Sequence, residues 1–371
     1  MGPLQLNDAF VRAFRVYDVA DGIRLEACRQ LFEKGGAATR RLKLVREGSE
    51  YIQLSNPPLL VELGPRPLTL GGVSREVQVA ARVFDFGCIS VALTLQLPKG
   101  TTTEALVPLV DLLTDDPAVD ALALDEVNKL RVALEPAFED PHLWEKNEGY
   151  TVVLARQLEG NPDGAAVLAD PHLARLLVGE VKEPALSGSE EREVLSEHYS
   201  YTPKDLAVIE WNAAFLYEPS GSEDLVDLLE FANAQLLELR YYDSVLDVEL
   251  ARVYDAIGQK KGGTILYSPY KRMLRELMLT LIELSEFIER VENALKIVGD
   301  VYLARVYEAT GRQLRVGRWT EQVSRKHRLL QQTYGLLKGE VDTDRSLTLE
   351  VMIVVLIILE ILMAVTRVTQ H

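Results

Sequence analysis

The stretch FLYEPSGSEDLVDLL, residues 215–229, marks the point at which the sequence pattern of the chain changes. Before the turn at residues 218–221, short apolar runs alternate with helical patterns. After the turn, apolar side chains recur every three or four residues, as on one buried helix face. They are Leu225, Leu228, Leu229, Ala232, Leu236 and Leu239. Ser220 and Glu223 have the spacing of a capping box. We therefore predict an α+β fold, in which a mixed head with a mainly antiparallel sheet precedes long helices.

The region before the turn has the pattern of short strands with a few helices between them. We expect strands at residues 9–17, 51–54, 59–63, 76–84, 88–97 and 149–156, and a central strand at 206–217. Helical spacing appears at residues 23–32, 103–113 and 117–138, and Ser187 has the spacing of a helix start. The alternation of Val77, Val79, Ala81 and Val83 predicts one buried face.

The region after the turn predicts three long helices joined by short loops, the second at about 270–310 and the third from about Trp319. Gly258–Pro269 and Gly311–Gly317 interrupt the helical pattern. Short loops imply antiparallel neighbours. We predict three parts: an α/β head at 1–218, a coiled-coil-like arm at 219–345 and a hydrophobic helix at 346–368.

The composition excludes several functional classes. The 371-residue chain has a net charge of −16, which argues against a surface that coats nucleic acid. Two distant cysteines, Cys28 and Cys88, predict buried thiols rather than a disulfide framework or a metal site. No catalytic, cofactor or metal-binding motif is present; Asp85-Phe86-Gly87 lacks the other kinase motifs and predicts a hairpin turn. We expect a protein that is not an enzyme and needs no cofactor.

The C-terminal segment is apolar on all sides of its predicted helix. Residues 347–365 would span roughly 28 Å, close to the roughly 30 Å of a bilayer core. We predict a membrane anchor, with the bulk of the chain cytoplasmic. Its residues are Leu349, Val351, Ile353, Leu356, Leu359, Glu360, Leu362 and Val365. Because a carboxylate inside a bilayer is costly, Glu360 would be protonated, would reach the interface or would face a partner helix. The alternative is a helix buried inside an oligomer.

Polar side chains crowd the first two long helices. They are Asn233, Glu238, Arg240, Tyr241, Tyr242, Asp243, Asp247, Arg290, Glu292, Asn293, Lys296 and Asp300. One interpretation is that paired charges set the register of antiparallel helices. The other is a site for a ligand or a partner protein.

A basic patch follows in an otherwise acidic chain. It consists of Arg312, Arg315, Arg318, Arg325, Lys326 and Arg328. Acidic residues of the preceding helix could neutralise it, or it could bind an acidic partner, including RNA.

Three blocks resemble one family. They are residues 83–87 (VFDFG), residues 232–243 (ANAQLLELRYYD) with Leu246 and Asp247, and residues 290–296 (RVENALK) with Asp300 and Tyr302; the apolar tail from Leu349-Glu350 is a fourth element. Together they resemble the uncharacterised family named for "required for meiotic nuclear division", also called domain of unknown function 155, over residues 75–365. The resemblance implies a non-enzymatic, membrane-anchored protein that oligomerises and has a link to translation at a membrane. Without a transit peptide, the chain looks like a bacterial member.

Two functions remain open from the sequence. The first is a non-enzymatic, membrane-anchored scaffold that forms a homo-oligomer and binds a protein or another acidic partner, with RNA bound only indirectly. The second is a soluble oligomeric ligand-binding protein or enzyme whose C-terminal helix is buried between subunits.

Overall fold

The computed structural model describes residues 2–35, 39–41, 44–45, 51–54, 56–181, 186–258, 270–298 and 301–368. The chain forms two compact units, each built from two stretches of sequence. Unit 1 comprises residues 1–241 and 289–319, and unit 2 comprises residues 242–288 and 320–371. The two units are described separately below. The predicted division into head, arm and terminal helix stays a prediction.

A ten-stranded sheet forms the centre of unit 1, with the order β12-β13-β14-β11-β1-β8-β7-β6-β3 and with β9 paired to β1. The strands are β1 (Gln5–Asp18), β3 (Thr39–Arg41), β6 (Leu59–Leu70), β7 (Val73–Val83), β8 (Cys88–Gln96), β9 (Thr101–Thr102), β11 (Asn147–Leu158), β12 (His198–Tyr199), β13 (Leu206–Ile209) and β14 (Ala213–Tyr217). Among these described strands only β11 and β14 run parallel. The central strand β1 pairs along most of its length with both β11 and β8.

Two smaller sheets complete the strands of unit 1. β2 (Ala20–Ile23) pairs with β10 (Phe138–Pro141), and β5 (Tyr51–Leu54) lies between β4 (Leu44–Val45) and β15 (Leu295–Val298).

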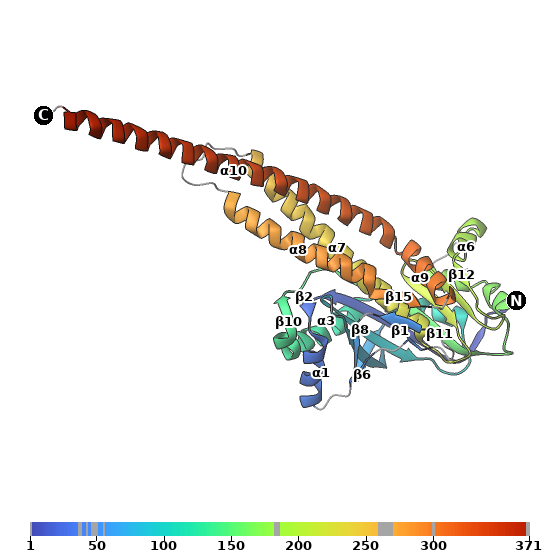
Figure 1. The fold of residues 1–371 in the computed structure, drawn as a ribbon. Coiled ribbons are helices and arrows are strands. Elements are labelled where there is room, and N and C mark those ends of the chain that lie inside the picture. Colours follow the sequence, from blue (N-terminus) through green and yellow to red (C-terminus); the bar gives the residue numbers. More distant parts are fainter. Residues whose placement is uncertain are drawn as a thin grey trace. The chain divides into compact units, whose positions relative to one another are not determined.

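Helices cover both faces of the large sheet (Figure 1). One face packs against α1 (Leu25–Lys34), α2 (Thr103–Asp115), α3 (Pro117–Leu134) and α5 (Leu173–Val178). The other face packs against the first turns of α7 (Asp224–Gly258) and against α9 (Val301–Gln313). The side chains of β1 alternate between the two cores, as the two-residue period of a strand requires: Val11 belongs to the first core, Phe10 and Phe14 to the second.

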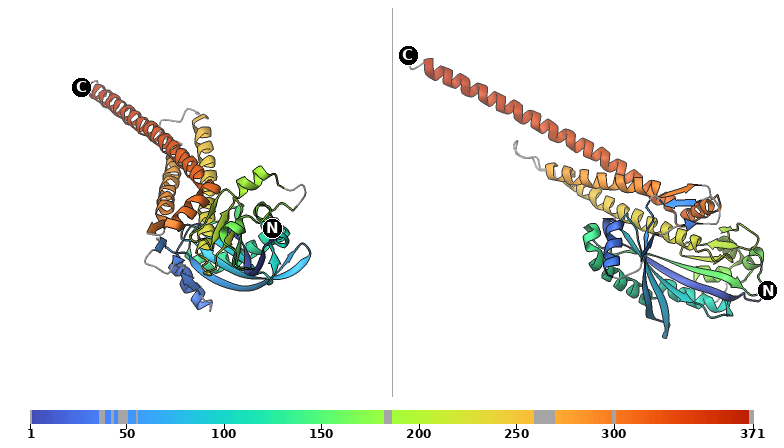
Figure 2. Two further views of the ribbon diagram at one scale, coloured as in Figure 1. Left: turned by 90° about the vertical axis from the view of Figure 1, so that its right-hand side faces the viewer. Right: turned by 60° about the horizontal axis from the view of Figure 1, so that its bottom comes forward.

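The remaining helices of unit 1 are short: η1 (Glu135–Ala137), α4 (Gly164–Leu168) and α6 (Gly188–Val194). Unit 2 contains the second part of α7 with most of α8 (Tyr270–Ala294) and most of α10 (Val316–Val368). Val323, Leu330 and Leu337 of α10 are buried at intervals of seven residues, the spacing of a coiled-coil seam. Figure 2 shows α10 as one unbroken helix in both views.

The predicted fold class is confirmed, with 54% helix and 27% strand, a mainly antiparallel sheet and long C-terminal helices. Val77, Val79, Ala81 and Val83 form the predicted buried face. Ser187 caps α6 by accepting the Glu190 N–H at 3.2 Å. Cys28 and Cys88 are buried and are not joined by a disulfide.

Several predicted elements are wrong. Residues 270–310 are not one helix, because β15 interrupts them where it pairs with β5. Residues 206–217 form a hairpin of two strands rather than one strand. The cap of α7 comes from Ser222, whose Oγ accepts the Asp224 N–H at 3.1 Å. The predicted loop at 258–269 lies, beyond Gly258, outside the described residues.

The predicted membrane anchor is also wrong. In the described part of the chain we find no helix with the length and apolarity needed to cross a bilayer. The uninterrupted apolar run is the nine residues from Val351 to Leu359, between Glu350 and Glu360, and it rises only about 14 Å as a helix. This overturns the anchor residues from Leu349 to Val365, the membrane as a partner and the membrane-anchored localisation.

Candidate functional site

The predicted polar cluster of the first long helix is divided between the two units. Asn233, Glu238, Arg240 and Tyr241 belong to unit 1, whereas Tyr242, Asp243 and Asp247 belong to unit 2. Arg290, Glu292 and Asn293 lie in α8 and Lys296 lies in β15, and Asp300 lies outside the described residues. Arg290, Glu292, Asn293 and Lys296 belong to unit 1.

Within unit 1 these polar side chains have local partners. Glu238 is buried and accepts a hydrogen bond from the Cys88 Sγ at 2.8 Å. The Asn233 side chain donates to the carbonyl oxygen of Leu229 at 2.8 Å. Arg240 forms an ion pair with Glu148 in β11. These contacts fix α7 against the sheet, as expected of structural charges.

Tyr241 contacts a second buried charge pair. Its ring stacks on His142 with centroids 5.0 Å apart, and the His142 Nε2 lies 3.0 Å from the Asp18 Oδ1. Burial alone would lower the pKa of His142, but the hydrogen bond and charge of Asp18 outweigh burial and raise it. Burial raises the pKa of Asp18 despite its hydrogen bond with His142. Both groups therefore bind a proton more readily in the folded state.

Within unit 2, Lys326 joins the predicted basic patch to α7. Its Nζ lies 2.8 Å from an Asp243 carboxylate oxygen and 2.6 Å from one of Asp247. Burial lowers the pKa of Lys326, but its two carboxylate hydrogen bonds outweigh burial and raise it. Lys326 is therefore neutralised by acids of α7, and not by acids of the helix that precedes the patch, where the sequence suggested them. Arg325 and Arg328 are exposed on the same helix.

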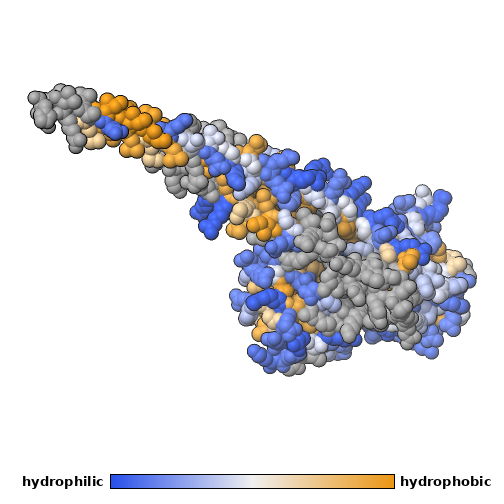
Figure 3. Space-filling view, viewed as in Figure 1, coloured by the Kyte–Doolittle hydropathy of each residue, from blue (hydrophilic) through white to orange (hydrophobic). Residues whose placement is uncertain are grey.

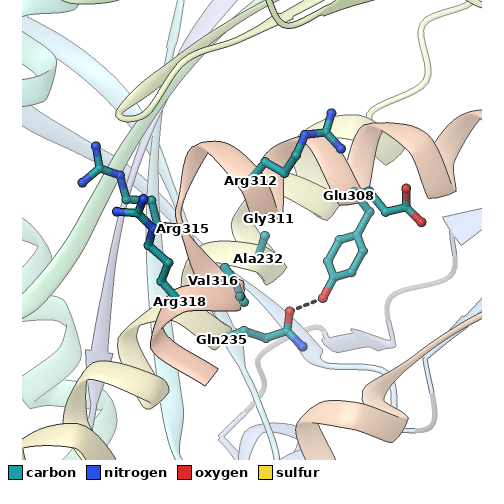
Figure 4. A pocket seen from close by; sticks show the side chains of 10 residues that line it. Ala232, Gln235, Glu308, Gly311, Arg312, Arg315, Val316 and Arg318 are labelled. Atoms are coloured by element: carbon teal, nitrogen blue, oxygen red, sulfur yellow. Dashed lines mark hydrogen bonds between the residues drawn. The ribbon is translucent and has the colours of Figure 1, made fainter. Parts of the chain in front are cut away.

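The other three members of the basic patch line one cavity in unit 1, which we name the arginine pocket. Its volume is about 550 Å³. It is lined by Ala232, Gln235, Tyr307, Glu308, Gly311, Arg312, Arg315, Val316, Gly317 and Arg318. α7, α9, the turn after α9 and the first turn of α10 thus contribute to it. Figure 4 shows the side chains of Arg315 and Arg318 extending in one direction and that of Arg312 in another.

The turn between α9 and α10 places the arginines. α9 buries Tyr302, Val306 and Ala309 on one face, so its other face is left for the pocket. The chain reverses at Arg315, which has a positive φ of 54°. The Arg315 carbonyl then accepts the N–H groups of Arg318 and Trp319 at 3.0 and 3.3 Å.

Two glycines open the wall of the pocket. A Cβ atom added at Gly311 or Gly317 would have no neighbouring atom within 4 Å. Both glycines line the pocket, and a side chain at either position would meet open space.

The arginines differ in how far they are neutralised. The Arg312 Nη2 donates to the Glu197 Oε2 at 3.0 Å and to the Tyr199 hydroxyl at 2.8 Å. Burial would raise the pKa of Glu197, but the hydrogen bonds from Tyr199 and Arg312 lower it. No ion pair joins Arg315 or Arg318 to another described residue. Two guanidinium groups at the pocket therefore keep their charge available.

The interior of the pocket contains one buried polar pair. The Tyr307 hydroxyl donates to the Gln235 Oε1, and Gln235 is only 1% exposed. Burial raises the pKa of Tyr307 to about 12, so its hydroxyl stays protonated at neutral pH. The Gln235 Nε2 is buried without a hydrogen-bond partner among the described residues. An unpaired amide donor costs free energy unless an acceptor reaches it.

The arrangement suits binding rather than a reaction. It combines positive charge, an apolar interior and one unpaired donor, the features of a site for an organic anion. Among the described residues, no group of three His, Cys, Asp or Glu side chains could hold a metal ion.

Sequence reasoning singled out the three arginines but missed Gln235 and Tyr307. The one sequence feature that could have indicated the pocket is Gln235, a polar residue inside the apolar pattern of α7. Its closeness to Tyr307 depends on tertiary packing across 72 residues of sequence.

A model of the family described as "Uncharacterized protein MJ0711, N-terminal domain" matches residues 8–223. A similar protein is "Uncharacterized protein MJ0711" of Methanocaldococcus jannaschii, 29% identical over 177 residues, or 47% of this chain and 54% of the relative. The chain thus spans about half the length of this curated relative. The family match ends before α7, so the arginine pocket lies outside it.

These descriptions name no activity and make no connection with the family that the sequence blocks resemble. That resemblance therefore stays a prediction, as do the scaffold role, the translation link and the absence of enzymatic activity.

Proposed function

Because the chain belongs to the family described as "Uncharacterized protein MJ0711, N-terminal domain", whose description assigns no activity, we propose a function from its own site: it binds a small organic anion in the arginine pocket. The supporting observation is that three groups line the same cavity. Arg315 and Arg318 form no ion pair with a described residue, and the buried Gln235 amide has no hydrogen-bond partner for its Nε2 among the described residues. About 550 Å³ lies within the roughly 300–1,000 Å³ of small-molecule sites. The ligand has an apolar body and a carboxylate or phosphate group.

The volume of the pocket provides the test. Gly317→Leu adds a bulky side chain at a position that lines the pocket, whereas Gly335→Leu adds the same side chain on α10 in unit 2. Both glycines are helical, and a Cβ at either meets nothing within 4 Å, so both variants are expected to fold. Isothermal titration with phenyl phosphate should show binding to the wild type and to Gly335→Leu and none to Gly317→Leu.

Two further results bear on this proposal. Inorganic phosphate, which has no apolar body, should bind more weakly than phenyl phosphate. If Gly317→Leu binds phenyl phosphate as the wild type does, the pocket is not the binding site and the proposal fails.

A second candidate function, self-association, is supported by the exposed apolar end of α10 (Figure 3). Apolar side chains from Leu349 to Met363 are each 46–63% exposed. Together they expose on the order of 1,000 Å², more than the ~300–600 Å² of the largest patch on a typical monomer. A standard interface buries about 800 Å² on each partner. We infer that a second copy of this helix covers the patch.

The spacing of the side chains supports helix pairing. Val351, Val354, Ile358 and Ile361 are separated by three, four and three residues, the pattern of a coiled-coil seam. With Val351 at heptad position a, Glu350 lies at g and Glu360 at c, both outside the seam, where carboxylates can remain solvated.

Sedimentation velocity tests the interface. Ile358→Glu and truncation after Arg345 should both convert an oligomer into a monomer, because a charge or the loss of the patch removes the apolar contact. Leu336→Glu is the matched control, since Leu336 is 73% exposed on the same helix outside the patch. An oligomer that survives truncation would contradict this role of the helix.

A further inference from the structure

A second cavity in unit 1 lies on the sheet face that carries the first turns of α7. Its volume is about 940 Å³, and strands β1, β3, β6, β7 and β8 contribute side chains to it. Five carboxylates and three guanidinium groups line it. With all of them ionised, the lining carries two net negative charges, opposite in sign to the arginine pocket.

The deepest charged group is a guanidinium shared by two carboxylates. Arg82 of β7 forms ion pairs with Asp227 and with Glu230, the latter at 2.5 Å. Their side chains are 7%, 11% and 0% exposed, in that order. One positive charge therefore faces two negative charges away from water, where an uncompensated charge is costly. Burial raises the pKa of Asp227, although the charge of Arg82 acts in the opposite direction.

One of these carboxylates has an oxygen without a donor. The Glu230 Oε2 accepts from Arg82, but the Glu230 Oε1 is buried and has no hydrogen-bond partner among the described residues. A carboxylate oxygen can only accept, so the missing partner is an N–H or O–H donor.

The second ion-pair group of the cavity is already complete. Glu223 accepts from Arg12 at 2.9 Å and from Arg156 at 2.6 Å. The Arg12 Nε also donates to the Thr94 hydroxyl at 2.9 Å. The unsatisfied negative charge therefore lies at Asp227 and Glu230, in the first turns of α7.

We propose that this cavity binds an aliphatic diamine in its doubly protonated form. One primary ammonium donates to the Glu230 Oε1 beside Arg82, and the second is attracted by the exposed carboxylate of Glu62. Its positive charges complement the net negative charge of the lining, and the short methylene chain lies against Ala80 and Ala92 of the sheet. Because the described residues offer no metal-binding group, an ammonium with directed N–H donors fits better than a bare divalent cation.

Isothermal titration at constant ionic strength tests the site with 1,4-diaminobutane. The matched control compound is the same dication with all six N–H hydrogens replaced by methyl groups, which keeps the charge and removes the donors. We expect one diaminobutane site per chain and at least tenfold weaker binding of the methylated dication. Equal affinity for the two, or no diaminobutane binding up to about 10 mM, would overturn the proposal.

Glu230→Gln tests the position of the site. It leaves one buried carboxylate, that of Asp227, to pair with the one guanidinium of Arg82, so the variant is expected to fold and to melt no lower than the wild type. Its affinity for diaminobutane should fall at least tenfold, whereas Glu62→Gln at the exposed rim should change affinity about twofold. If Glu230→Gln does not fold, thermal unfolding of the wild type tests the proposal instead. Diaminobutane must raise the melting temperature of the wild type, and the methylated dication must not. Phenyl phosphate binding is independent of this site, so failure here leaves the proposed anion site intact.

Discussion

Replacing Arg315 by glycine separates ligand binding from stability more cleanly than any other change at the arginine pocket. Arg315 has φ 54°, a left-handed conformation that costs a non-glycine residue about 1 kcal/mol. Glycine adopts this conformation without that cost. Its more flexible unfolded state, however, lowers the free energy of unfolding by roughly 0.4–1 kcal/mol. The two terms nearly cancel, so Arg315→Gly should keep the free energy of unfolding within about 0.5 kcal/mol of the wild type.

Binding should respond in a different way. Arg315 is exposed, so its attraction to an anion about 4 Å away is close to the aqueous value of about 1 kcal/mol, with a further contribution from a charge-assisted hydrogen bond. A total near 1.4 kcal/mol corresponds to about a tenfold loss of affinity. We therefore expect phenyl phosphate to bind Arg315→Gly about ten times more weakly.

Isothermal titration measures the affinity, and urea denaturation measures the stability. Arg325→Ala is the control, because Arg325 is an equally exposed arginine of the predicted basic patch but lies in unit 2. Unchanged affinity in Arg315→Gly would refute the role of this guanidinium. Equal losses in both variants would show that the general charge of the chain, and not the pocket, attracts the anion.

Three predictions concern stability. Arg240→Ala should lower the free energy of unfolding by about 2–3 kcal/mol. This is less than the roughly 3–5 kcal/mol expected for a fully buried ion pair, because the Arg240 side chain is 30% exposed. An unchanged melting curve would show that its ion pair with Glu148 has no structural role. Gly87→Ala should cost more than about 3 kcal/mol in urea denaturation, since the residue has φ 111° and its new Cβ would overlap the Ala20 carbonyl oxygen. The pKa of His142 is raised in the folded state, so its protonation stabilises the fold fully below the unfolded pKa of about 6.5. This stabilisation is lost as the pH rises through the folded pKa. Unfolding curves between pH 6 and 8 should therefore show a decline in the free energy of unfolding of the wild type but not of His142→Gln.

Much of the sheet could be predicted from local patterns. The alternation at Val77, Val79, Ala81 and Val83 produces one buried face wherever the strand pairs, so a short window of sequence contains the necessary information. The hairpin turn at Gly87 was equally local, because its left-handed φ favours glycine.

Other elements depend on distant partners. Leu295–Val298 continues a helical pattern in the sequence, yet it becomes β15 because Tyr51–Leu54 offers it a strand edge more than 200 residues away. Tertiary pairing overrides local propensity in such a segment. Leu206–Tyr217 is an apolar run interrupted by Glu210 and Asn212. It divides at these residues into β13 and β14, which pair with each other, and β14 also pairs with β11.

The candidate site was predicted only in part for the same reason. Arg312, Arg315 and Arg318 are close together in sequence and could be recognised as a group. Gln235 joins them only because α7 packs against α9 in the same core. The sequence also could not separate Lys326, which is paired with acids of α7, from arginines that remain available for a ligand.

The position of β1 has a consequence for synthesis of the chain. β1 leaves the ribosome before one of its two main neighbours, β11, which ends about 140 residues later. At roughly 5–20 residues per second, β1 waits about 7–30 s for that edge to be covered. During this interval Phe10, Val11 and Phe14 have no complete core to enter. Nascent chains of this protein should therefore be clients of ribosome-associated chaperones, and slow translation between β8 and β11 should increase their aggregation.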